Sequence, residues 1–240
     1  MKIDVAFLFA GEFVPRGLAE RMMKSVKSAM PEATIYHQTD ATTPPFDGCE
    51  TIRLAWDDTR DIAGFFWKHL ARFARDHERF IKLDYDCVVM KDVSHVFDNP
   101  EKVILTIREN DATVAPVLHE RHPHNAGVMF ANGYSDFWKA VCLHYHSIPD
   151  RDGWMDGQDA LEAVVRTGVY PILDLPAFEY NYTPRTEDEV FKDKYIVHYK
   201  GGRKHWGADN TVKTRIAGWM ARERAELWLA KKYPELCEPK

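Results

Sequence analysis

The sequence predicts an α/β fold in which a mostly parallel sheet is covered by helices on both faces. Strand-like and helix-like segments alternate through the first half of the chain. The continuous apolar run 3–10, which ends at Gly11, is typical of a strand buried on both faces. The 240 residues contain no internal repeat, low-complexity tract or clear linker. In such a fold, ligands bind beyond the carboxyl ends of the strands.

The other elements follow from apolar periodicity and from turn residues. Residues 18–30 are expected to form a helix that stops before Pro31, and apolar side chains at i, i+3 and i+4 spacing predict an amphipathic helix over 62–73. Residues 80–83 form a short apolar strand segment that leads directly into Asp84. The remaining expected strands are 33–37, 103–107, 112–118, 128–131 and 195–199, and the remaining expected helices are 134–146, 158–167 and 211–232.

Composition narrows the class of protein. Hydrophobic residues make up 45% of the chain, which predicts a sizeable core, and the formal net charge of −5 argues against a general nucleic-acid coat. No apolar run approaches the roughly 20 residues that cross a bilayer, and the segment 1–10 is too short for a signal peptide and contains Asp4. The four cysteines are far apart in sequence, which indicates free thiols. We therefore expect a cytoplasmic protein.

Asp84 and Asp86 flank Tyr85 at the end of the predicted strand 80–83. Carboxylate oxygens close to one point suit a hard cation such as Mn²⁺ or Mg²⁺. An isolated Asp-x-Asp is more often a solvated acidic turn. Here the pair lies between two expected buried strands, 80–83 and the apolar run 87–90, where burial is costly unless a cation neutralises the charge.

A second candidate segment spans 197–206. His198 ends an apolar strand and could offer a neutral imidazole to a metal. Gly201 and Gly202 allow a backbone to approach a phosphate closely, and Lys204 could pair with a diphosphate. Taken one by one, His198 would be interpreted as an ordinary core or edge histidine and Lys204 as an ordinary surface lysine.

Together these segments form an ordered set of motifs. They are Leu83-Asp84-Tyr85-Asp86, Asn125-Ala126-Gly127-Val128-Met129, Gln158-Asp159-Ala160-Leu161, Tyr180-Asn181 and His198-Tyr199-x-Gly201-x-x-Lys204-x-Trp206. The set resembles the GT-A glycosyltransferases of the glycogenin and lipopolysaccharide galactosyltransferase type (family 8-like). The resemblance covers residues 1–206, which we expect to be the nucleotide-sugar-binding and catalytic domain. Residues 207–240 are expected to form a basic helical segment packed on the same domain.

The resemblance implies a metal-dependent, retaining glycosyltransferase that uses a nucleotide sugar, most simply a UDP-sugar. It implies that Asp84, Asp86 and His198 hold a divalent ion, usually Mn²⁺, that bridges the donor diphosphate. It also implies donor contacts and a catalytic set beside the anomeric carbon. The donor contacts are Lys68, Asn125, Lys204, Gly201 and Ala10, and the residues near the anomeric carbon are Gln158 and Asp159.

Two positions and one segment depart from the family pattern. Gly157 stands before Gln158, where the family commonly has an aspartate, so Asp156 or Asp159 would take the task of the missing acid. His205 follows Lys204, where the family commonly has proline. The segment 119–124 contains three histidines, which permits a zinc site, but we expect a solvated loop.

The segment 203–232 carries eight Lys or Arg residues against three acids. Lys213, Arg224 and Lys231 would line one stripe of the expected last helix. The stripe suits a polyanionic acceptor, such as nucleic acid or lipopolysaccharide, or the surface of an anionic membrane, but it is equally consistent with a solvated face.

Two alternatives keep the same fold. A non-catalytic nucleotide-sugar binding protein would explain the glycine at 157. A nucleotidyltransferase uses similar sheets and metals, but it has no need for a late histidine and lysine at the spacing of His198 and Lys204.

Overall fold

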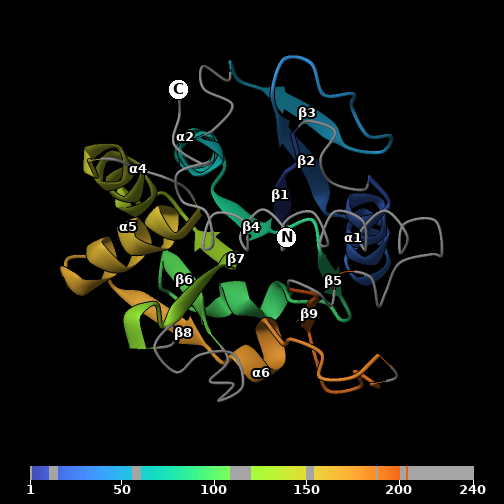
Figure 1. The fold of residues 1–240 in the computed structure, drawn as a ribbon. Coiled ribbons are helices and arrows are strands. Elements are labelled where there is room, and N and C mark those ends of the chain that lie inside the picture. Colours follow the sequence, from blue (N-terminus) through green and yellow to red (C-terminus); the bar gives the residue numbers. More distant parts are fainter. Residues whose placement is uncertain are drawn as a thin grey trace, which may run out of the picture.

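The computed structural model describes residues 2–10, 16–55, 61–108, 120–149, 154–187, 189–200 and 204. In this part of the chain, seven strands form one sheet in the order β3-β2-β1-β4-β7-β6-β8, and β5 pairs with β9 in a separate ribbon (Figure 1). The strands are β1 (Asp4–Leu8), β2 (Thr34–Thr39), β3 (Glu50–Arg53), β4 (Arg79–Leu83), β5 (Cys87–Val89), β6 (Val103–Ile107), β7 (His124–Asn132), β8 (Ile172–Leu175) and β9 (Ile196–His198). The helices are α1 (Arg16–Ala29), α2 (Ile62–Asp76), η1 (Ser94–Asp98), α4 (Phe137–Ser147), α5 (Trp154–Arg166) and α6 (Ala177–Tyr180).

The sheet is mostly parallel, as the sequence predicts. Strands β1 to β4 run in one direction, β6 pairs in parallel with β8, and β7 is antiparallel to both β4 and β6. Phe7 of β1 lies opposite Leu83 of β4. The residues that follow these two strands therefore emerge at the same edge of the sheet.

Helices cover both faces of the sheet (Figure 1). Helices α2, α4 and α5 pack together on one face, and α1 lies on the other face, against β5. Side chains alternate along each strand: Val5 and Phe7 belong to the core on the α1 side, whereas Ala6 belongs to the core under α2. The sheet is thus buried on both sides, which explains the apolar run from Val5 to Leu8 in β1.

Most predicted elements are confirmed within a few residues, but two strands were not predicted. Strand β3 contains Glu50 and Arg53, both exposed, and lies at one edge of the sheet. Strand β8 forms the opposite edge and has an exposed Asp174. Edge strands need no continuous apolar run, so their sequence signal is weak. The expected strand 112–118 and helix 211–232 lie outside the described residues.

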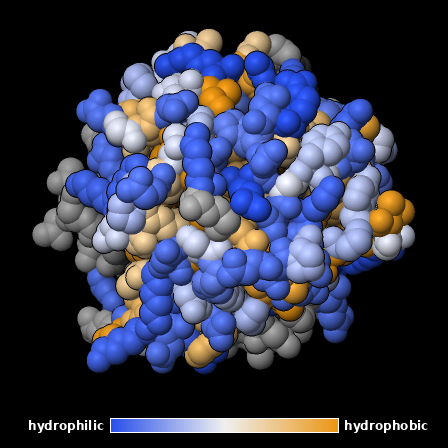
Figure 2. Space-filling view, turned by 180° about the vertical axis from the view of Figure 1, so that it is seen from behind, coloured by the Kyte–Doolittle hydropathy of each residue, from blue (hydrophilic) through white to orange (hydrophobic). Residues whose placement is uncertain are grey.

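On the face shown in Figure 2, hydrophobic side chains form small separate groups among hydrophilic ones. Within the described ranges, no helix combines the length and the apolar character that a membrane span needs.

Candidate active site

The site is built where β4 ends and β5 begins. Strand β4 ends at Leu83, the chain turns through Asp84 and Tyr85, and the backbone N–H of Cys87 closes the turn by donating to the Asp84 carbonyl at 3.0 Å. Cys87 pairs with His198 across the antiparallel β5–β9 ribbon. This pairing joins two segments that are more than a hundred residues apart in the sequence, and it sets His198 beside Asp86.

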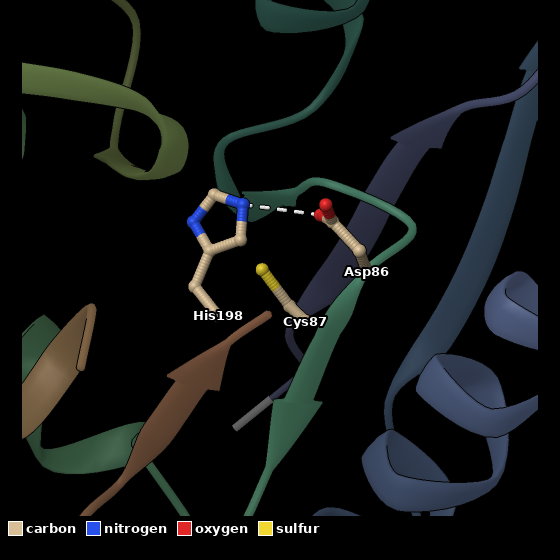
Figure 3. A group of neighbouring side chains, drawn as sticks. All are labelled: Asp86, Cys87 and His198. Atoms are coloured by element: carbon tan, nitrogen blue, oxygen red, sulfur yellow. Dashed lines mark ion pairs between the residues drawn. The ribbon is translucent and has the colours of Figure 1, made fainter. Parts of the chain in front are cut away.

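The two carboxylates and the imidazole converge, as Figure 3 shows for Asp86 and His198. The Nε2 atom of His198 lies 3.0 Å from Asp86 Oδ1 and 3.5 Å from Asp84 Oδ2. Asp86 and His198 are each 3% exposed, whereas the side chain of Asp84 is 35% exposed. The cluster is therefore closed on one side and open to solvent through Asp84.

The tautomer of His198 suits a metal ligand. His198 Nδ1 lies 2.9 Å from the side-chain oxygen of Asn181, and that oxygen can only accept a hydrogen bond, so Nδ1 carries the proton. Burial lowers the pKa of His198, which favours the neutral ring. The lone pair of Nε2 then faces Asp86 Oδ1, a buried atom without a hydrogen-bond donor. Facing lone pairs of nitrogen and oxygen, with the second ring nitrogen held by an amide, fit a bound divalent cation.

Lys204 approaches the same carboxylate from the other side. Its Nζ lies 3.0 Å from Asp86 Oδ2 and 2.9 Å from the hydroxyl of Tyr85. Burial alone would raise the pKa of the Asp86 carboxyl, but the ammonium of Lys204, and His198 when its ring is protonated, hold it below the ordinary value. Asp86 is thus ionised and paired at neutral pH.

Cys87 completes a group of three possible ligands, with ligand atoms of Asp86, Cys87 and His198 all within 4.8 Å of one another (Figure 3). Burial raises the pKa of the Cys87 thiol well above its usual value, and the charges of Asp86 and Asp84 add to the effect. Without a bound ion the sulfur is therefore protonated at neutral pH. Hard cations such as Mn²⁺ and Mg²⁺ prefer oxygen and nitrogen ligands to sulfur, so Asp84, Asp86 and His198 are the candidate ligand set for them.

Gly127 of β7 provides the space for the imidazole. A Cβ atom at this position would lie 2.2 Å from Cε1 of His198 and 2.7 Å from the side-chain oxygen of Asn125. The Gly127 carbonyl also accepts the backbone N–H of Asp84 at 2.8 Å. Only glycine allows β7 to support Asp84 and to contact the ring of His198 at the same time.

Two expected donor-binding residues lie beside this cluster. The β1–β4 register places Ala10 at the edge of the sheet that bears Asp84 and Asp86. Asn125 is 3% exposed, and its side-chain oxygen accepts the backbone N–H of Gly127 at 3.0 Å. Gly201 lies outside the described residues, and Lys68 is exposed on α2, where its charge acts on the thiol of Cys142 in α4.

Gln158 of α5 is linked to the cluster through two basic residues. Its side-chain oxygen accepts a hydrogen bond from Arg108 at 2.9 Å, and Gln158 is 3% exposed. Burial, followed by the charge of Arg108, lowers the pKa of Lys200 to about 8, while Asp86 and Asp84 act in the opposite direction. Lys200 therefore lies within electrostatic range of both Arg108 and the carboxylates.

The acids near Gln158 occupy different environments. Asp159 is held by Arg121, at 2.8 Å, and by Nε2 of His122, also at 2.8 Å. Asp156 is half-buried in the first turn of α5. A Cβ at Gly157 would lie 3.0 Å from the ring nitrogen of Trp67 in α2, so this position faces the α2–α5 contact. The packing of two helices is a sufficient physical reason for the glycine at 157.

The expectation of a solvated histidine loop at 119–124 is wrong for two of its histidines. His122 is fully buried and His124 is 6% exposed. His124 lies between Glu162 of α5, at 3.1 Å, and Asp174 of β8, at 3.0 Å. These acids come from distant elements, so the local sequence cannot show that they neutralise the histidines. The two described histidines belong to no metal-ligand group in the described part of the chain, and His119 lies outside it.

This pairing predicts a pH-dependent contribution to stability. Burial lowers the pKa of His124, but Glu162 and Asp174 outweigh burial and raise it above the ordinary histidine value of 6.5. The contribution is therefore fully present below that value and is lost as pH rises through the folded-state pKa. We expect Glu162→Gln to reduce the free energy of unfolding by about 3 kcal/mol at pH 6 and by less at pH 9. Urea denaturation at both pH values measures this.

The control variant is Asp174→Asn, because the side chain of Asp174 is 51% exposed. Solvent screening limits that pair to about 1 kcal/mol or less. Equal losses at pH 6 and pH 9 for Glu162→Gln would contradict a charged His124.

Sequence reasoning missed three residues of the site: Lys82, Asn181 as the partner of His198, and Arg108. Lys82 is buried within β4, and its Nζ donates to Asp84 Oδ1 and, at 2.6 Å, to the carbonyl of Ala126. A single lysine in an apolar strand belongs to no motif. Its position two residues before Asp84, on the same face of the strand, was the available signal.

The solved structures that this chain resembles in fold include glycosyltransferases. The galactosyltransferase LgtC, in complex with donor and acceptor sugar analogs, has a TM-score of 0.58 and 15% identity over 91% of this chain and 95% of its own. The glycosyltransferase GlyE of Streptococcus pneumoniae TIGR4, in its apo form, has a TM-score of 0.57 and 13% identity over 92% of this chain and 63% of its own. No protein-family model matches the chain, and no curated sequence matches it. The chain has the GT-A glycosyltransferase fold.

Proposed function

We propose that this protein is a metal-dependent glycosyltransferase that moves a sugar from a nucleotide-sugar donor, most simply a UDP-sugar, to an acceptor. The observation on which the proposal depends is the convergence of Asp84, Asp86 and His198, with Lys204 beside them, at the carboxyl end of β4. The GT-A fold adds support, because its solved examples LgtC and GlyE are glycosyltransferases.

Each residue of the cluster has a defined task in this proposal. Asp84, Asp86 and His198 would hold the divalent ion, which when bound neutralises charge on the leaving nucleoside diphosphate. Asn181 keeps the proton on Nδ1 of His198, so Nε2 stays available as a ligand. Lys204 exchanges its contact with Asp86 for a contact with the diphosphate, where negative charge grows as the sugar leaves.

The sugar would bind between this cluster and α5. Asn125 and Gln158 are the proposed sugar contacts, and Arg108 fixes the amide of Gln158 by donating to its oxygen. Because a guanidinium has no acceptor, this contact determines which end of the amide faces Arg108. Retention of the anomeric configuration remains part of the proposal, with Asp156 or Asp159 as the nearby acid and Lys68 and Ala10 as further donor contacts.

Product analysis tests the proposal against its alternatives. The protein is incubated with UDP-sugars and Mn²⁺ without acceptor, and the nucleotide products are separated. Slow release of UDP supports glycosyl transfer. Tight binding without any release indicates a nucleotide-sugar binding protein, and pyrophosphate indicates a nucleotidyltransferase.

The proposed contact between Lys204 and the diphosphate predicts selective weakening of binding. We expect Lys204→Ala to raise the Kd for UDP with Mn²⁺ by about tenfold to a hundredfold, since a charge-assisted hydrogen bond contributes about 1.5–3 kcal/mol. The Kd for uridine should change little. Calorimetric titration of both ligands measures this, with the exposed Lys192→Ala as the matched control. An equal rise in the Kd for uridine and for UDP would show that Lys204 does not contact the diphosphate.

The expected basic helix 211–232 lies outside the residues that the structure describes. A polyanionic acceptor contacted by Lys213, Arg224 and Lys231 remains a prediction from the sequence alone.

A further inference from the structure

Lys82 is a buried cation to which the proposed function gives no task. It is 2% exposed and lies on the face of β4 that packs under α2. Its Nζ lies 4.4 Å from the centre of the Phe66 ring, a cation–π contact. A lysine this deeply buried is costly unless its charge is compensated.

Three fixed partners compensate that charge. Nζ donates to Asp84 Oδ1 and, at 2.6 Å, to the carbonyl of Ala126, while the ring of Phe66 covers it. Lys82 lies in the last pleat of β4 and Asp84 directly follows the strand, two residues later, so the end of β4 holds the two side chains close together. Lys204 differs, because it reaches Asp86 from the segment after β9 and its side chain is 14% exposed. Lys204 can turn toward an incoming phosphate, whereas Lys82 is held in place.

Counting formal charges shows what this fixed cation does. The carboxylates of Asp84 and Asp86 contribute −2, and the ammonium groups of Lys82 and Lys204 that contact them contribute +2, so these two contact pairs sum to zero. A divalent ion alone would bring the total to +2. A divalent ion together with the two negative charges of a nucleotide-sugar diphosphate restores zero.

We propose that Lys82 is a specificity-determining residue that keeps the site from binding a divalent ion on its own, so that the ion binds together with a diphosphate. Lys82 acts in two ways. Its ammonium repels the ion, and it occupies Asp84 Oδ1, which is a potential ligand atom. When the ion binds together with the nucleotide sugar, their charges cancel, so the charge of Lys82 repels the pair only weakly. This inference rests on the proposed function.

The test is Lys82→Met, which keeps the length of the side chain and removes its charge. Free Mn²⁺ is measured by electron paramagnetic resonance, first with protein alone and then with protein and UDP-glucose. We expect the variant to bind Mn²⁺ alone at least about tenfold more tightly. The repulsion between charges a few ångströms apart inside a protein exceeds the free energy that corresponds to a tenfold change in affinity. Joint binding of Mn²⁺ and UDP-glucose should change by much less. A gain for Mn²⁺ alone that is much larger than the gain for joint binding is the readout that a merely structural role would not give.

The control is Lys192→Met, which removes the same charge at an exposed position and should leave Mn²⁺ binding unchanged. Unchanged or weaker binding of Mn²⁺ alone by a folded Lys82→Met variant overturns the inference. If that variant does not fold, the wild-type protein provides the test. The inference is overturned if the wild-type protein binds Mn²⁺ as tightly without UDP-glucose as with it. If wild-type protein binds no Mn²⁺ even with UDP-glucose, the proposed function itself fails.

Discussion

Replacing Asp86 by asparagine is expected to reduce sugar transfer about a thousandfold or more. The change removes a negatively charged ligand and keeps the size of the side chain. A catalytic divalent ion contributes several kcal/mol to the barrier, and each 1.4 kcal/mol corresponds to a tenfold change in rate. Asp86 also holds Lys204 at 3.0 Å, so the loss affects both cations near the diphosphate. The measurement is release of UDP from the donor with Mn²⁺ present.

The control for Asp86→Asn is Asp193→Asn, the same chemical change at an exposed position. Thermal unfolding of both variants shows whether the fold is retained. A folded Asp86→Asn variant with near wild-type turnover would remove Asp86 from the metal site. It would leave the acidic turn after β4 without a task in catalysis.

Gly127→Ala is expected to disrupt the site without changing any proposed ligand. The new Cβ would lie 2.2 Å from Cε1 of His198, a distance at which an atom must move. His198 lies on β9 and is held by Asn181, so its Nε2 should be displaced from the carboxylates. We expect joint Mn²⁺ and UDP binding to weaken by about 10- to 100-fold, as when the support of a metal-ligating histidine is lost. Overpacking should also cost about 1–3 kcal/mol of stability.

Gly168→Ala is the matched control for this variant. Gly168 follows α5 with a φ of +66°, and no atom lies within 4 Å of a Cβ built there. Its substitution should cost about 1–2 kcal/mol in stability through backbone strain alone and leave Mn²⁺ binding intact. If Gly127→Ala and Gly168→Ala lose stability alike and both bind Mn²⁺ normally, the contact between Gly127 and His198 does not determine ligand geometry.

The sequence predicted the mostly parallel sheet because its buried strands are continuous apolar runs and its helices have regular apolar spacing. Edge strands β3 and β8 were not predicted, because their residues are partly polar and need only one neighbouring strand. The candidate ligands Asp84, Asp86 and His198 were found because they belong to ordered motifs. That they meet in space depends on the pairing of Cys87 with His198, which no local pattern specifies.

The residues that support these ligands were harder to predict. Asn181 was seen as part of a motif, but its hydrogen bond to His198 depends on the approach of α6 to β9. Lys82 belongs to no sequence motif, and the groups that surround its ammonium, the Ala126 carbonyl and the Phe66 ring, come from β7 and α2. The histidines 122 and 124 suggested a solvent-exposed loop because their acidic partners lie on α5 and β8. In each case the missing information was a contact between elements far apart in the sequence.

The most direct test of the metal-dependent site is the location of Mn²⁺ in crystals grown with UDP and MnCl₂. Anomalous diffraction at the manganese edge locates the ion independently of the protein atoms. We predict a single strong peak that contacts Nε2 of His198, the carboxylates of Asp84 and Asp86, and the diphosphate of UDP, with Lys204 turned from Asp86 to a phosphate oxygen. Bound UDP without a manganese peak at this cluster, or a peak from which His198 points away, would contradict the assignment of these residues as the metal site.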